Sequence, residues 1–388
     1  MAIERNHRLL AAVLAVLAAV PRVFPADRRP DPGRLTIAVL NARFLFDGRE
    51  PEGEGGFPWK GNPARARAHL RDIAGLVRAL SSDIIHISEV EDLATLERLA
   101  LEVGDPTYRA YLVPGRDDFT RQNVGLLSRI DPIRSLFRTE EWAVGPGGGP
   151  AQGVPKHYAA LLPLGDLEVL LVGIHLLAFP DDPDRAPRRE SQAEVLRRLA
   201  VAEGSGQERE VIVLGDFNDF DPEVPDVAGN APISRVLETV RTLRREDRSD
   251  DLGNAASRLA PGERYSAFYD ANANGVDDGI AERSLTDHIL LSPRLHARIA
   301  SARVLAGHDP LRVTDHFPLE VTIDLAPGDR CSLAGDANGD GASTIEDAIA
   351  ILRALFQGEP AECESAIDAN GDGRLDIADP VSLLLRLS

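Results

Sequence analysis

The chain has 388 residues, 43% of them hydrophobic, which is enough for about two or three domains that bury a sizeable core. Its formal net charge of −19 repels nucleic acid and anionic membranes, and this argues against a protein that binds polyanions passively. The charge does not exclude an enzyme that meets phosphate through bound cations, because such a site needs clustered carboxylates.

Residues 1–26 are predicted to form an export signal or an N-terminal anchor. Arg5 and Arg8 precede an apolar run at 9–20, which is short for a bilayer span and typical of a signal peptide. Ala26 is a candidate last residue of the signal, but the neighbouring Phe24 makes the cleavage site irregular, so cleavage and retention as an anchor both stay open. We therefore expect a secreted or cell-surface protein.

From residue 33 to residue 326, short apolar runs alternate with amphipathic helical patterns. Mixed strands with helices between them predict an α/β or α+β domain. The predicted helices are 64–81 and 188–202. The predicted strands, most of them buried on both faces, are 35–42, 83–90, 124–129, 169–177, 211–219, 287–292 and 319–325.

Polar and ionisable residues stand at the ends of many of these strands. Ligand-binding groups gather at strand ends in α/β sheets, and so many of them together are hard to explain by packing. Asp216 and Asn218 would point to the same side if the backbone stays extended between them. The full set is Asn41, Glu89, His175, Asp216 and Asn218, with the tripeptide Thr-Asp-His at 286–288 and again at 314–316.

The order "N … SEV … IHL … GDFN … TDH … TDH" over residues 35–325 resembles the endonuclease/exonuclease/phosphatase superfamily, best known from the fold of deoxyribonuclease I. The resemblance implies a four-layer α/β/β/α sandwich of two packed mixed sheets. It also implies cleavage of phosphoester bonds with Mg²⁺ or Mn²⁺. By position, Glu89 matches the main metal carboxylate, with Asn41 beside it and Asp315 as a second acid near the metal. A hard divalent cation held by such oxygens neutralises the charge that builds up on an attacked phosphate.

The same resemblance assigns the groups that act on the water and the phosphate, which are Asp216, Asn218, His175, Asp287 and His316. Asp216 and Asn218 match the pair that orients the nucleophilic water and the scissile phosphate, and His175 matches a phosphate contact. His316 matches the catalytic histidine, and Asp287 matches the acid that fixes its tautomer and supports its charged form. The two Thr-Asp-His copies would thus do different work, and we expect His288 to be structural.

The tail contains two copies of a twelve-residue loop, at 336–347 and at 368–379. One polar turn could arise by chance, but two with the same ligand spacing predict calcium binding. Gly341 and Gly373 stand at position six, where a calcium loop turns sharply. The expected ligands are Asp336, Asn338, Asp340 and Asp347 in the first loop, and Asp368, Asn370, Asp372, Asp376 and Asp379 in the second.

An apolar helix is predicted after each loop, at 348–357 and 380–388. This duplicated loop-helix unit resembles a type I dockerin, so residues 327–388 are expected to form a small all-α, calcium-binding dockerin-like domain. The resemblance implies a cohesin-like partner, but only loosely, because positions ten and eleven hold Ile-Glu and Ile-Ala in place of the usual Ser-Thr. Cys331 and Cys363 flank the first unit and can pair in an exported chain, and their pairing stays open.

These features together predict a secreted, monomeric, metal-dependent phosphoesterase, with extracellular DNA or RNA as the leading substrate. Phospholipid or sugar-phosphate cleavage is one alternative. A catalytically inactive, calcium-dependent binding or scaffold protein is another. The stretch 270–279, "DANANGVDDG", starts with calcium-like spacing but has no proper last ligand, so it is taken as a polar surface turn.

Overall fold

The chain forms two compact units, Met1–Ile323 and Asp324–Ser388, which we describe separately. Residues 1–24 of the predicted export signal, Cys331 and Asp340 lie outside the residues that the structure describes. No helix among the described residues is long and apolar enough to cross a membrane. The computed structural model describes residues 25–165, 167–246, 248–325, 335–338, 343–361, 363 and 366–387.

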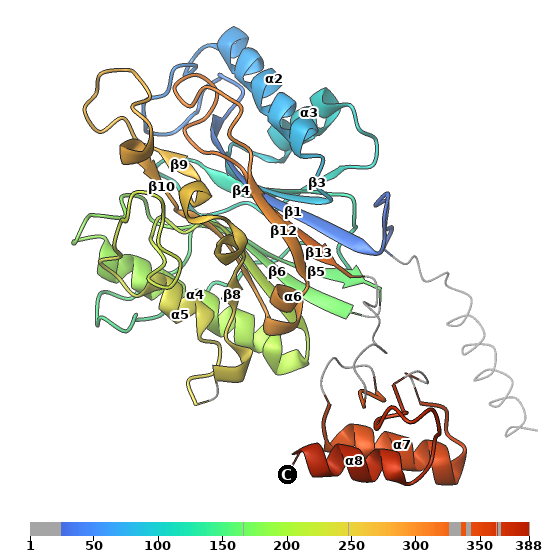
Figure 1. Ribbon diagram of the computed structural model, residues 1–388. Helices are drawn as coiled ribbons and strands as arrows, with labels where there is room; N and C mark the ends of the chain where they lie inside the picture. Colours follow the sequence, from blue (N-terminus) through green and yellow to red (C-terminus); the bar gives the residue numbers. More distant parts are fainter. Residues whose placement is uncertain are drawn as a thin grey trace, which may run out of the picture. The chain divides into compact units, whose positions relative to one another are not determined.

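The first unit contains a six-stranded mixed sheet with the strand order β12-β13-β1-β2-β4-β3 (Figure 1). β1 and β2 run parallel, whereas β4 is antiparallel to both β2 and β3. The strands are β1 (Arg34–Leu45), β2 (Ile84–Val90), β3 (Arg109–Leu112), β4 (Asn123–Ser128), β12 (Ile299–Val304) and β13 (Leu319–Asp324).

A second, five-stranded sheet has the order β5-β6-β7-β11-β8. β6 and β7 are parallel, and β5 and β11 flank them in the antiparallel sense. Its strands are β5 (His157–Leu164), β6 (Leu167–His175), β7 (Glu210–Asp216), β8 (Gly253–Asn254) and β11 (Asp287–Leu291). The short strands β9 (Ala267–Phe268) and β10 (Arg283–Ser284) pair separately as an antiparallel hairpin.

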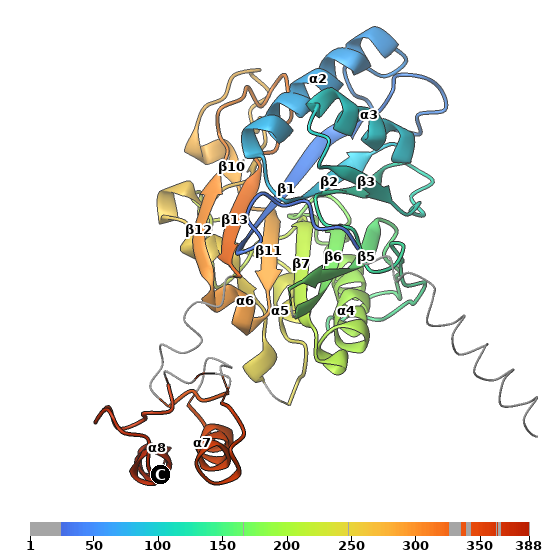
Figure 2. The same cartoon turned by 90° about the vertical axis from the view of Figure 1, so that its right-hand side faces the viewer.

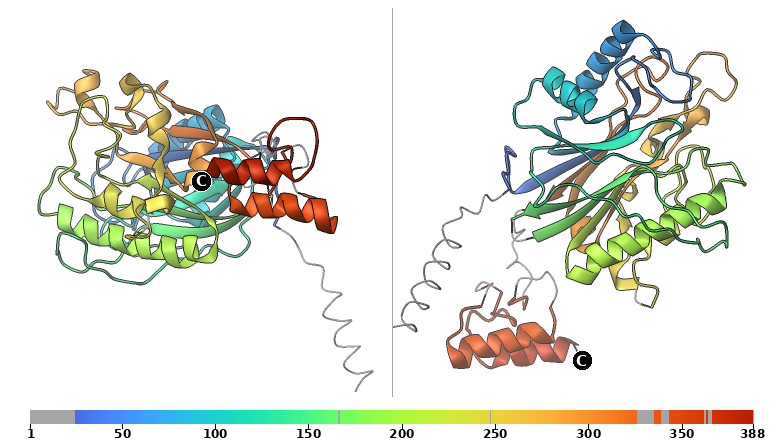
Figure 3. Two further views of the ribbon diagram at one scale, coloured as in Figure 1. Left: turned by 60° about the horizontal axis from the view of Figure 1, so that its bottom comes forward. Right: turned by 180° about the vertical axis from the view of Figure 1, so that it is seen from behind.

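Helices cover the outer face of each sheet (Figures 2 and 3). α2 (Pro63–Leu80) and α3 (Leu93–Val103) pack on the first sheet, and α4 (Ala186–Glu203) and α5 (Val236–Arg241) pack on the second. Their starts follow local chemistry, because the side chains of Asn62 and Asp92 accept backbone hydrogen bonds in the first turns of α2 and α3. The short helix α6 (Pro293–Ala297) follows β11. The predicted sandwich of two packed mixed sheets is confirmed.

Side-chain alternation along each strand separates the layers. In β2, Ile85 and Ile87 belong to the apolar cluster under α2 and α3, so Ile84 and His86 face the other sheet. His86 lies fully buried at this interface, with Nε2 3.0 Å from the carbonyl oxygen of Ile174 in the second sheet. Burial lowers the pKa of His86 to about 4, so a neutral imidazole links the two sheets.

We expect Gly173→Ala to lower the free energy of unfolding by roughly 1–3 kcal/mol, because a Cβ at this position overpacks the space between the sheets. It would lie 2.3 Å from Cζ of Tyr158 and 2.5 Å from Nδ1 of His86. Gly75→Ala in α2 is the matched control: its Cβ meets nothing within 4 Å, and the change should raise stability by up to about 1 kcal/mol. Urea unfolding of the two variants measures both effects, and equal stabilities would contradict this account of the interface.

The second unit contains α7 (Ile345–Gln357) and α8 (Ala378–Leu387). They share a small apolar cluster that includes Ala348, Ile351 and Leu383. Thr344 and Asp347 form a capping box at the start of α7. Both helices were expected from the apolar runs that follow the two acidic loops.

Candidate active site

Three predicted site residues lie side by side because of strand register. His175 ends β6 and stands opposite Asp216 at the end of β7, and Asp287 at the start of β11 stands opposite Asp216 from the other side. Directly paired residues point to the same face of a sheet. In β7, Leu214 is two positions before Asp216 and does not belong to the cluster under α4, so this face is the one that meets the first sheet.

Asn41 brings the first sheet into the site. Its Nδ2 donates to Oδ2 of Asp216 and to Oε1 of Glu89, each at 3.1 Å. Its Oδ1 accepts a hydrogen bond from the backbone of Arg43, and its carbonyl accepts one from the Thr314 hydroxyl. One buried amide therefore joins carboxylates that come from both sheets.

Glu89 reaches the site because the β2 strand is irregular there. Regular alternation would place it on the same face as Ile87, towards the helices. Instead Glu89 has φ of 63°, and the register with both neighbouring strands shifts at this point. Its Oε2 accepts a hydrogen bond from the backbone of Phe44, itself at φ of 51°. Such backbone outliers concentrate at functional sites.

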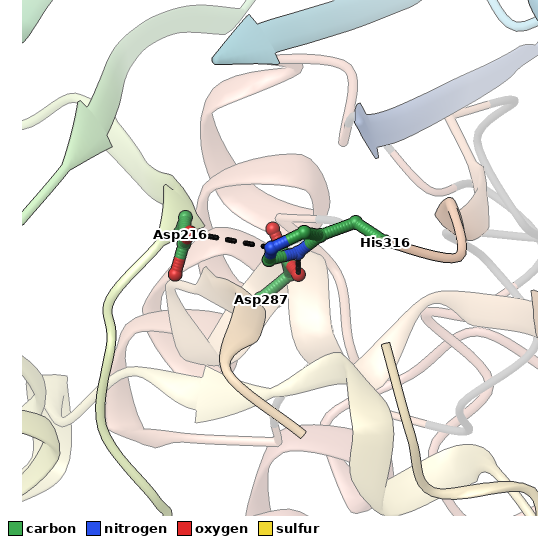
Figure 4. Close-up of side chains that lie close together, drawn as sticks. All are labelled: Asp216, Asp287 and His316. Atoms are coloured by element: carbon green, nitrogen blue, oxygen red, sulfur yellow. Dashed lines mark hydrogen bonds and ion pairs between the residues drawn. The ribbon is translucent and has the colours of Figure 1, made fainter. Parts of the chain in front are cut away.

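His316, from the second Thr-Asp-His copy, bonds to Asp287, from the first. Its Nδ1 lies 2.7 Å from Oδ2 of Asp287, and its Nε2 lies 3.8 Å from Oδ2 of Asp216 (Figure 4). The same Asp216 oxygen lies 3.7 Å from Nε2 of His175. Oδ2 of Asp216 is therefore the point on which an amide and two imidazoles converge.

Asp315 and Asn218 lie at the margin of this cluster. The Asp315 side chain is 40% exposed, and its Oδ2 is 3.9 Å from Nε of Arg43. Asn218 has φ of 48°, and its Nδ2 donates to the carbonyl of Leu176 at 3.3 Å. The backbone therefore turns after Asp216 and does not continue extended, so the geometric premise for placing Asn218 on the side of Asp216 does not hold.

The site is rich in negative charge. The pKa of Glu89 is raised, mainly by burial and secondly by the nearby carboxylate of Asp315. Burial and the Asp287 carboxylate raise the pKa of Asp216 to about 7. Burial disfavours the charged imidazole of His316, but the carboxylates around it, Asp287 above all, outweigh this and raise its pKa to about 10. Burial and then the Lys156 cation hold the pKa of His175 well below 6.5, so its ring is neutral.

Lys156 is a site residue that the sequence analysis missed. It is 9% exposed, and its Nζ donates to Gln122 and lies 3.6 Å from Oδ2 of Asp117. Burial lowers the pKa of Lys156, and the carboxylates of Asp117 and Glu89 oppose that shift. The sequence feature that could have pointed to Lys156 is the rarity of lysine: the chain has only two, and one of them directly precedes a predominantly apolar run.

His288 lies on the opposite face of β11 from Asp287. It is fully buried, with Nε2 3.0 Å from the carbonyl oxygen of Asp219 and Nδ1 3.0 Å from the Asn254 side chain. Its ring packs edge-on against Phe217. Neither hydrogen bond of the His288 side chain within the described chain is with the cluster around Asp216.

The sequence matches the model of the Endonuclease/Exonuclease/phosphatase family over residues 39–316, a range that holds every one of these side chains. The chain belongs to the endonuclease/exonuclease/phosphatase family. No curated protein matches it.

Solved structures with a similar fold come from several organisms. The 3′-5′ exonuclease NExo of Neisseria meningitidis is 17% identical, with 75% of this chain and 100% of that chain covered and a TM-score of 0.49. An AP endonuclease of Archaeoglobus fulgidus is 15% identical, with coverages of 75% and 99% and a TM-score of 0.47. An endonuclease/exonuclease/phosphatase family protein of Bacteroides thetaiotaomicron is 19% identical, with coverages of 75% and 94% and a TM-score of 0.46.

Membership of the family makes this chain a hydrolase of phosphoric esters, which confirms the expected enzyme class. Enzymes of the endonuclease/exonuclease/phosphatase family generally use a divalent metal such as Mg²⁺, and the donor set here fits one. The ligand atoms of Asp216, Asp287 and His316 lie within 4.8 Å of one another. His316 is cationic because its pKa is raised to about 10, so the oxygens around it, with those of Glu89 and Asn41 beside Asp216, are the donors that suit a hard cation. The raised pKa of Glu89 reflects carboxylates crowded in a desolvated place, which a hard cation relieves.

This endonuclease/exonuclease/phosphatase domain should bind Mg²⁺ more weakly as the pH falls below about 7. Asp216 then carries a proton, and a protonated carboxylate no longer offers its charge to the cation. The concentration of Mg²⁺ that gives half of its thermal stabilisation, measured at a pH on each side of this pKa, reports the effect. Asp216→Asn should lose most of this pH dependence. Equal Mg²⁺ affinity at both pH values in the parent protein would contradict it.

Proposed function

We propose that this protein is an exported, divalent-metal-dependent phosphodiesterase that cleaves nucleic acid. The observation that carries the proposal is the convergence of Asn41, His175 and His316 on one oxygen of Asp216, at 3.1, 3.7 and 3.8 Å. Each donor comes from a different segment of the fold, and two sheets must meet to assemble them. A structural salt bridge needs no such arrangement.

His316 is the proposed catalytic imidazole. Its Nδ1 is engaged by Asp287, which leaves Nε2 directed towards Asp216 and the substrate space. The cationic ring donates a hydrogen bond to a phosphate oxygen, and Asp287 holds the ring in that orientation. The other oxygen of Asp287, Oδ1, is buried and has no hydrogen-bond partner within the described chain.

Asp216 is the proposed acceptor for the proton of the attacking water. A general base acts best when its pKa lies near the working pH, and the pKa of Asp216 is raised to about 7. Neutral His175 lies on its other side and can donate to a phosphate oxygen without a change of charge. Its Nδ1 is also buried without a partner in the part of the chain that the structure describes.

Glu89 and Asn41, with Asp315 at the outer edge, are the residues proposed to hold Mg²⁺ or Mn²⁺. The ion supplies electrostatic stabilisation of the negative charge that develops on the phosphoryl oxygens. Lys156 lies within the same field and offsets part of the charge of Glu89 and Asp216. Asn218 is proposed to act through the turn it forms after Asp216, where its backbone N–H donates to Oδ1 of that carboxylate at 3.0 Å.

Nucleic acid is the proposed substrate. A second candidate is a small phosphodiester or sugar phosphate, which the formal net charge of −19 favours because nucleic acid is repelled at long range. Incubation of the protein with Mg²⁺ and DNA, RNA, sphingomyelin or inositol phosphates distinguishes them. Cleavage of DNA or RNA supports the nuclease, whereas turnover of small esters alone replaces it with the second candidate. No turnover of any of these substrates contradicts both.

The tail is proposed to be a calcium-binding, dockerin-like attachment module. In the loop 368–379, both oxygens of Asp368 accept backbone N–H groups, including Gly373 at 2.7 Å, and Asp379 accepts from Asp376 at 2.8 Å. Asp379 is fully buried, although no positively charged side chain contacts it among the described ion pairs. These contacts support a loop that is shaped to surround a cation. A cohesin-like protein and a place outside the cell are proposed on the sequence alone.

Calcium should increase the helix content of a fragment that contains residues 324–388. Without the cation the clustered carboxylates repel one another, so binding and folding are coupled. Far-ultraviolet circular dichroism of the fragment, with calcium and then with excess chelator, measures the change. A helix content that the chelator leaves unchanged would contradict the calcium assignment.

A further inference from the structure

We propose that the connection between β9 and β10, residues 270–282, is an additional Ca²⁺ site, in the catalytic unit and outside the active site. It is the stretch that the sequence analysis took for a polar surface turn, because position twelve of the loop is Ala281. The proposed oxygen ligands are Asp270, Asn272, Asn274, Asp278 and Glu282.

The first half of this loop has the same hydrogen-bonded framework as the acidic loop at 368–379. The N–H of Asn274, at position five, donates to Oδ1 of Asp270 at 3.1 Å, the same distance as at the matching position of the other loop. The N–H of Gly275 donates to Oδ2 of Asp270 at 2.8 Å, as Gly373 does to Asp368 at 2.7 Å. The two glycines have φ of 72° and 79°, so both loops turn at position six.

Glu282 is an independent observation that points to a ligand. It is only 5% exposed, and its Oε1 is buried without a hydrogen-bond partner in the described structure. Its Oε2 accepts from the N–H of Asp278, at position nine, at 2.9 Å. In the tail loop the position-nine N–H of Asp376 donates in the same way to the closing carboxylate, Asp379, at 2.8 Å. Glu282 therefore closes the loop at position thirteen through the same kind of contact that Asp379 makes at position twelve of the tail loop.

The side-chain amides of the two asparagines contact Asp278, another of the proposed ligands. Nδ2 of Asn272 and Nδ2 of Asn274 both donate to Oδ2 of Asp278, at 2.7 and 2.8 Å. Oδ1 of Asn272 accepts from the N–H of Asn274 at 3.0 Å, and Oδ1 of Asn274 accepts from the N–H of Val276 at 2.8 Å. A carbonyl oxygen has two lone pairs, so each of these oxygens can still accept a contact to an ion after a small rotation of the side chain. Without an ion the N–H groups satisfy Asp278, and with an ion the two amide oxygens join the carboxylates around it.

The charges favour a divalent ion. Asp277 is already paired with Arg283, which leaves the three carboxylates of Asp270, Asp278 and Glu282 for the cation. Ca²⁺ accepts six to eight oxygen ligands in adaptable geometry, whereas Mg²⁺ demands a near-ideal octahedron. A largely exposed loop with carboxylate and amide oxygens suits Ca²⁺.

The loop is attached to the backbone that holds the active site. Glu282 ends a 3₁₀ turn (Ile280–Glu282) that leads through β10 to Asp287, and its carbonyl accepts from Tyr269 at 3.0 Å. At its other end, Ala267 of β9 bridges to His316. A cation in the loop would tie the two ends of this hairpin together next to the catalytic pair.

Terbium luminescence tests the proposal in the full chain. The tail contains no tyrosine or tryptophan, whereas Tyr269 immediately precedes Asp270 and is 74% exposed. With Mg²⁺ in excess, Tb³⁺ should give luminescence on tyrosine excitation that Tyr269→Phe removes and that Ca²⁺ displaces. The absence of any signal that depends on Tyr269 would overturn the proposal, and it would leave the calcium assignment of the tail untouched.

Matched variants test the ligands. Glu282→Gln and Asp270→Asn should each weaken the competing affinity of Ca²⁺ by about tenfold or more, since affinity follows ligand charge. Asp31→Asn is the control, because Asp31 also accepts a backbone N–H two residues ahead, at 2.9 Å, in an exposed turn. Ca²⁺ affinity in Glu282→Gln equal to that of the parent would overturn the assignment.

A variant that should strengthen Ca²⁺ binding tests the proposal even if the variants that weaken it fold poorly. Asn272→Asp adds a carboxylate, so Ca²⁺ should bind more tightly and should raise the melting temperature more than in the parent. In a loop held only by its own hydrogen bonds, Asn272→Asp loses the bond to Asp278 and adds repulsion. Destabilisation that Ca²⁺ does not reverse would overturn the proposal.

Discussion

His316→Ala is expected to lower turnover by about 10² to 10⁴-fold, the usual contribution of a positioned acid–base group. The proposed reason is that Nε2, directed towards Asp216, is lost together with the cation that Asp287 supports. Asp287→Asn should give a comparable loss, because the imidazole remains but its orientation and charge lose their support. The double variant should be little worse than His316→Ala alone, since groups that act as a unit are not additive.

His288→Ala is the matched control for this series. It removes the same side chain from the other Thr-Asp-His copy, where the ring contacts Asn254 and the carbonyl of Asp219. We expect a lower melting temperature and nearly normal turnover per folded molecule. Equal losses of turnover in His288→Ala and His316→Ala, or a double variant whose losses multiply, would show that the wrong acid and histidine have been paired.

Glu89→Gln is expected to reduce activity at least about 100-fold at ordinary Mg²⁺ concentrations, since even outer-shell changes at metal sites cost 10 to 100-fold. Glutamine preserves the shape and can still accept from the backbone of Phe44, so the irregular strand should persist. What is lost is one charge of a hard-ion site. Part of the activity should therefore return as the Mg²⁺ concentration is raised.

Glu91→Gln provides the control for that charge. Glu91 follows the same strand two residues later, but its Oε2 accepts from the backbone of Asp47 at 2.7 Å and faces α3 through Thr95. Its substitution should leave the Mg²⁺ dependence of hydrolysis unchanged. If Glu89→Gln hydrolyses an aryl phosphodiester at the parent rate with the parent Mg²⁺ dependence, the metal assignment is wrong.

The sequence predicted most strands of the two sheets, because a buried strand usually leaves an apolar run. All seven predicted strands lie in strands of the two sheets, and 64–81 and 188–202 coincide with α2 and α4. β5 was missed although its eight residues are almost all buried. The short strands β3, β8, β9, β10 and β12 were also missed, since two to six residues carry little periodicity.

The site residues were found more readily than their geometry. Strand ends pointed to Asn41, Glu89 and Asp216, but no periodicity reveals a register that places Asp216 between His175 and Asp287. The left-handed backbone at Glu89 was equally invisible, because glutamate has no preference for positive φ. Asn218 was expected on the same side as Asp216 only if the backbone stayed extended, and the turn at Asn218 removes that condition.

Lys156 and Glu282 escaped for a different reason. Each is a charged residue whose importance depends on burial, and burial of a charged side chain is a property of the folded chain. In the sequence Lys156 is an ordinary cation before an apolar run in which no strand was predicted. Glu282 stands one place beyond the position at which a calcium loop is usually closed. Only the packing around each of them distinguishes it from a surface charge.

The link through Asn41, between Glu89 of one sheet and Asp216 of the other, has a consequence for the life of the protein before it folds. Neither sheet alone holds all of the proposed catalytic groups, so we expect a chain whose two sheets have not yet packed together to be inactive towards phosphoesters. Catalytic activity would therefore appear only when the two sheets pack together at the end of folding.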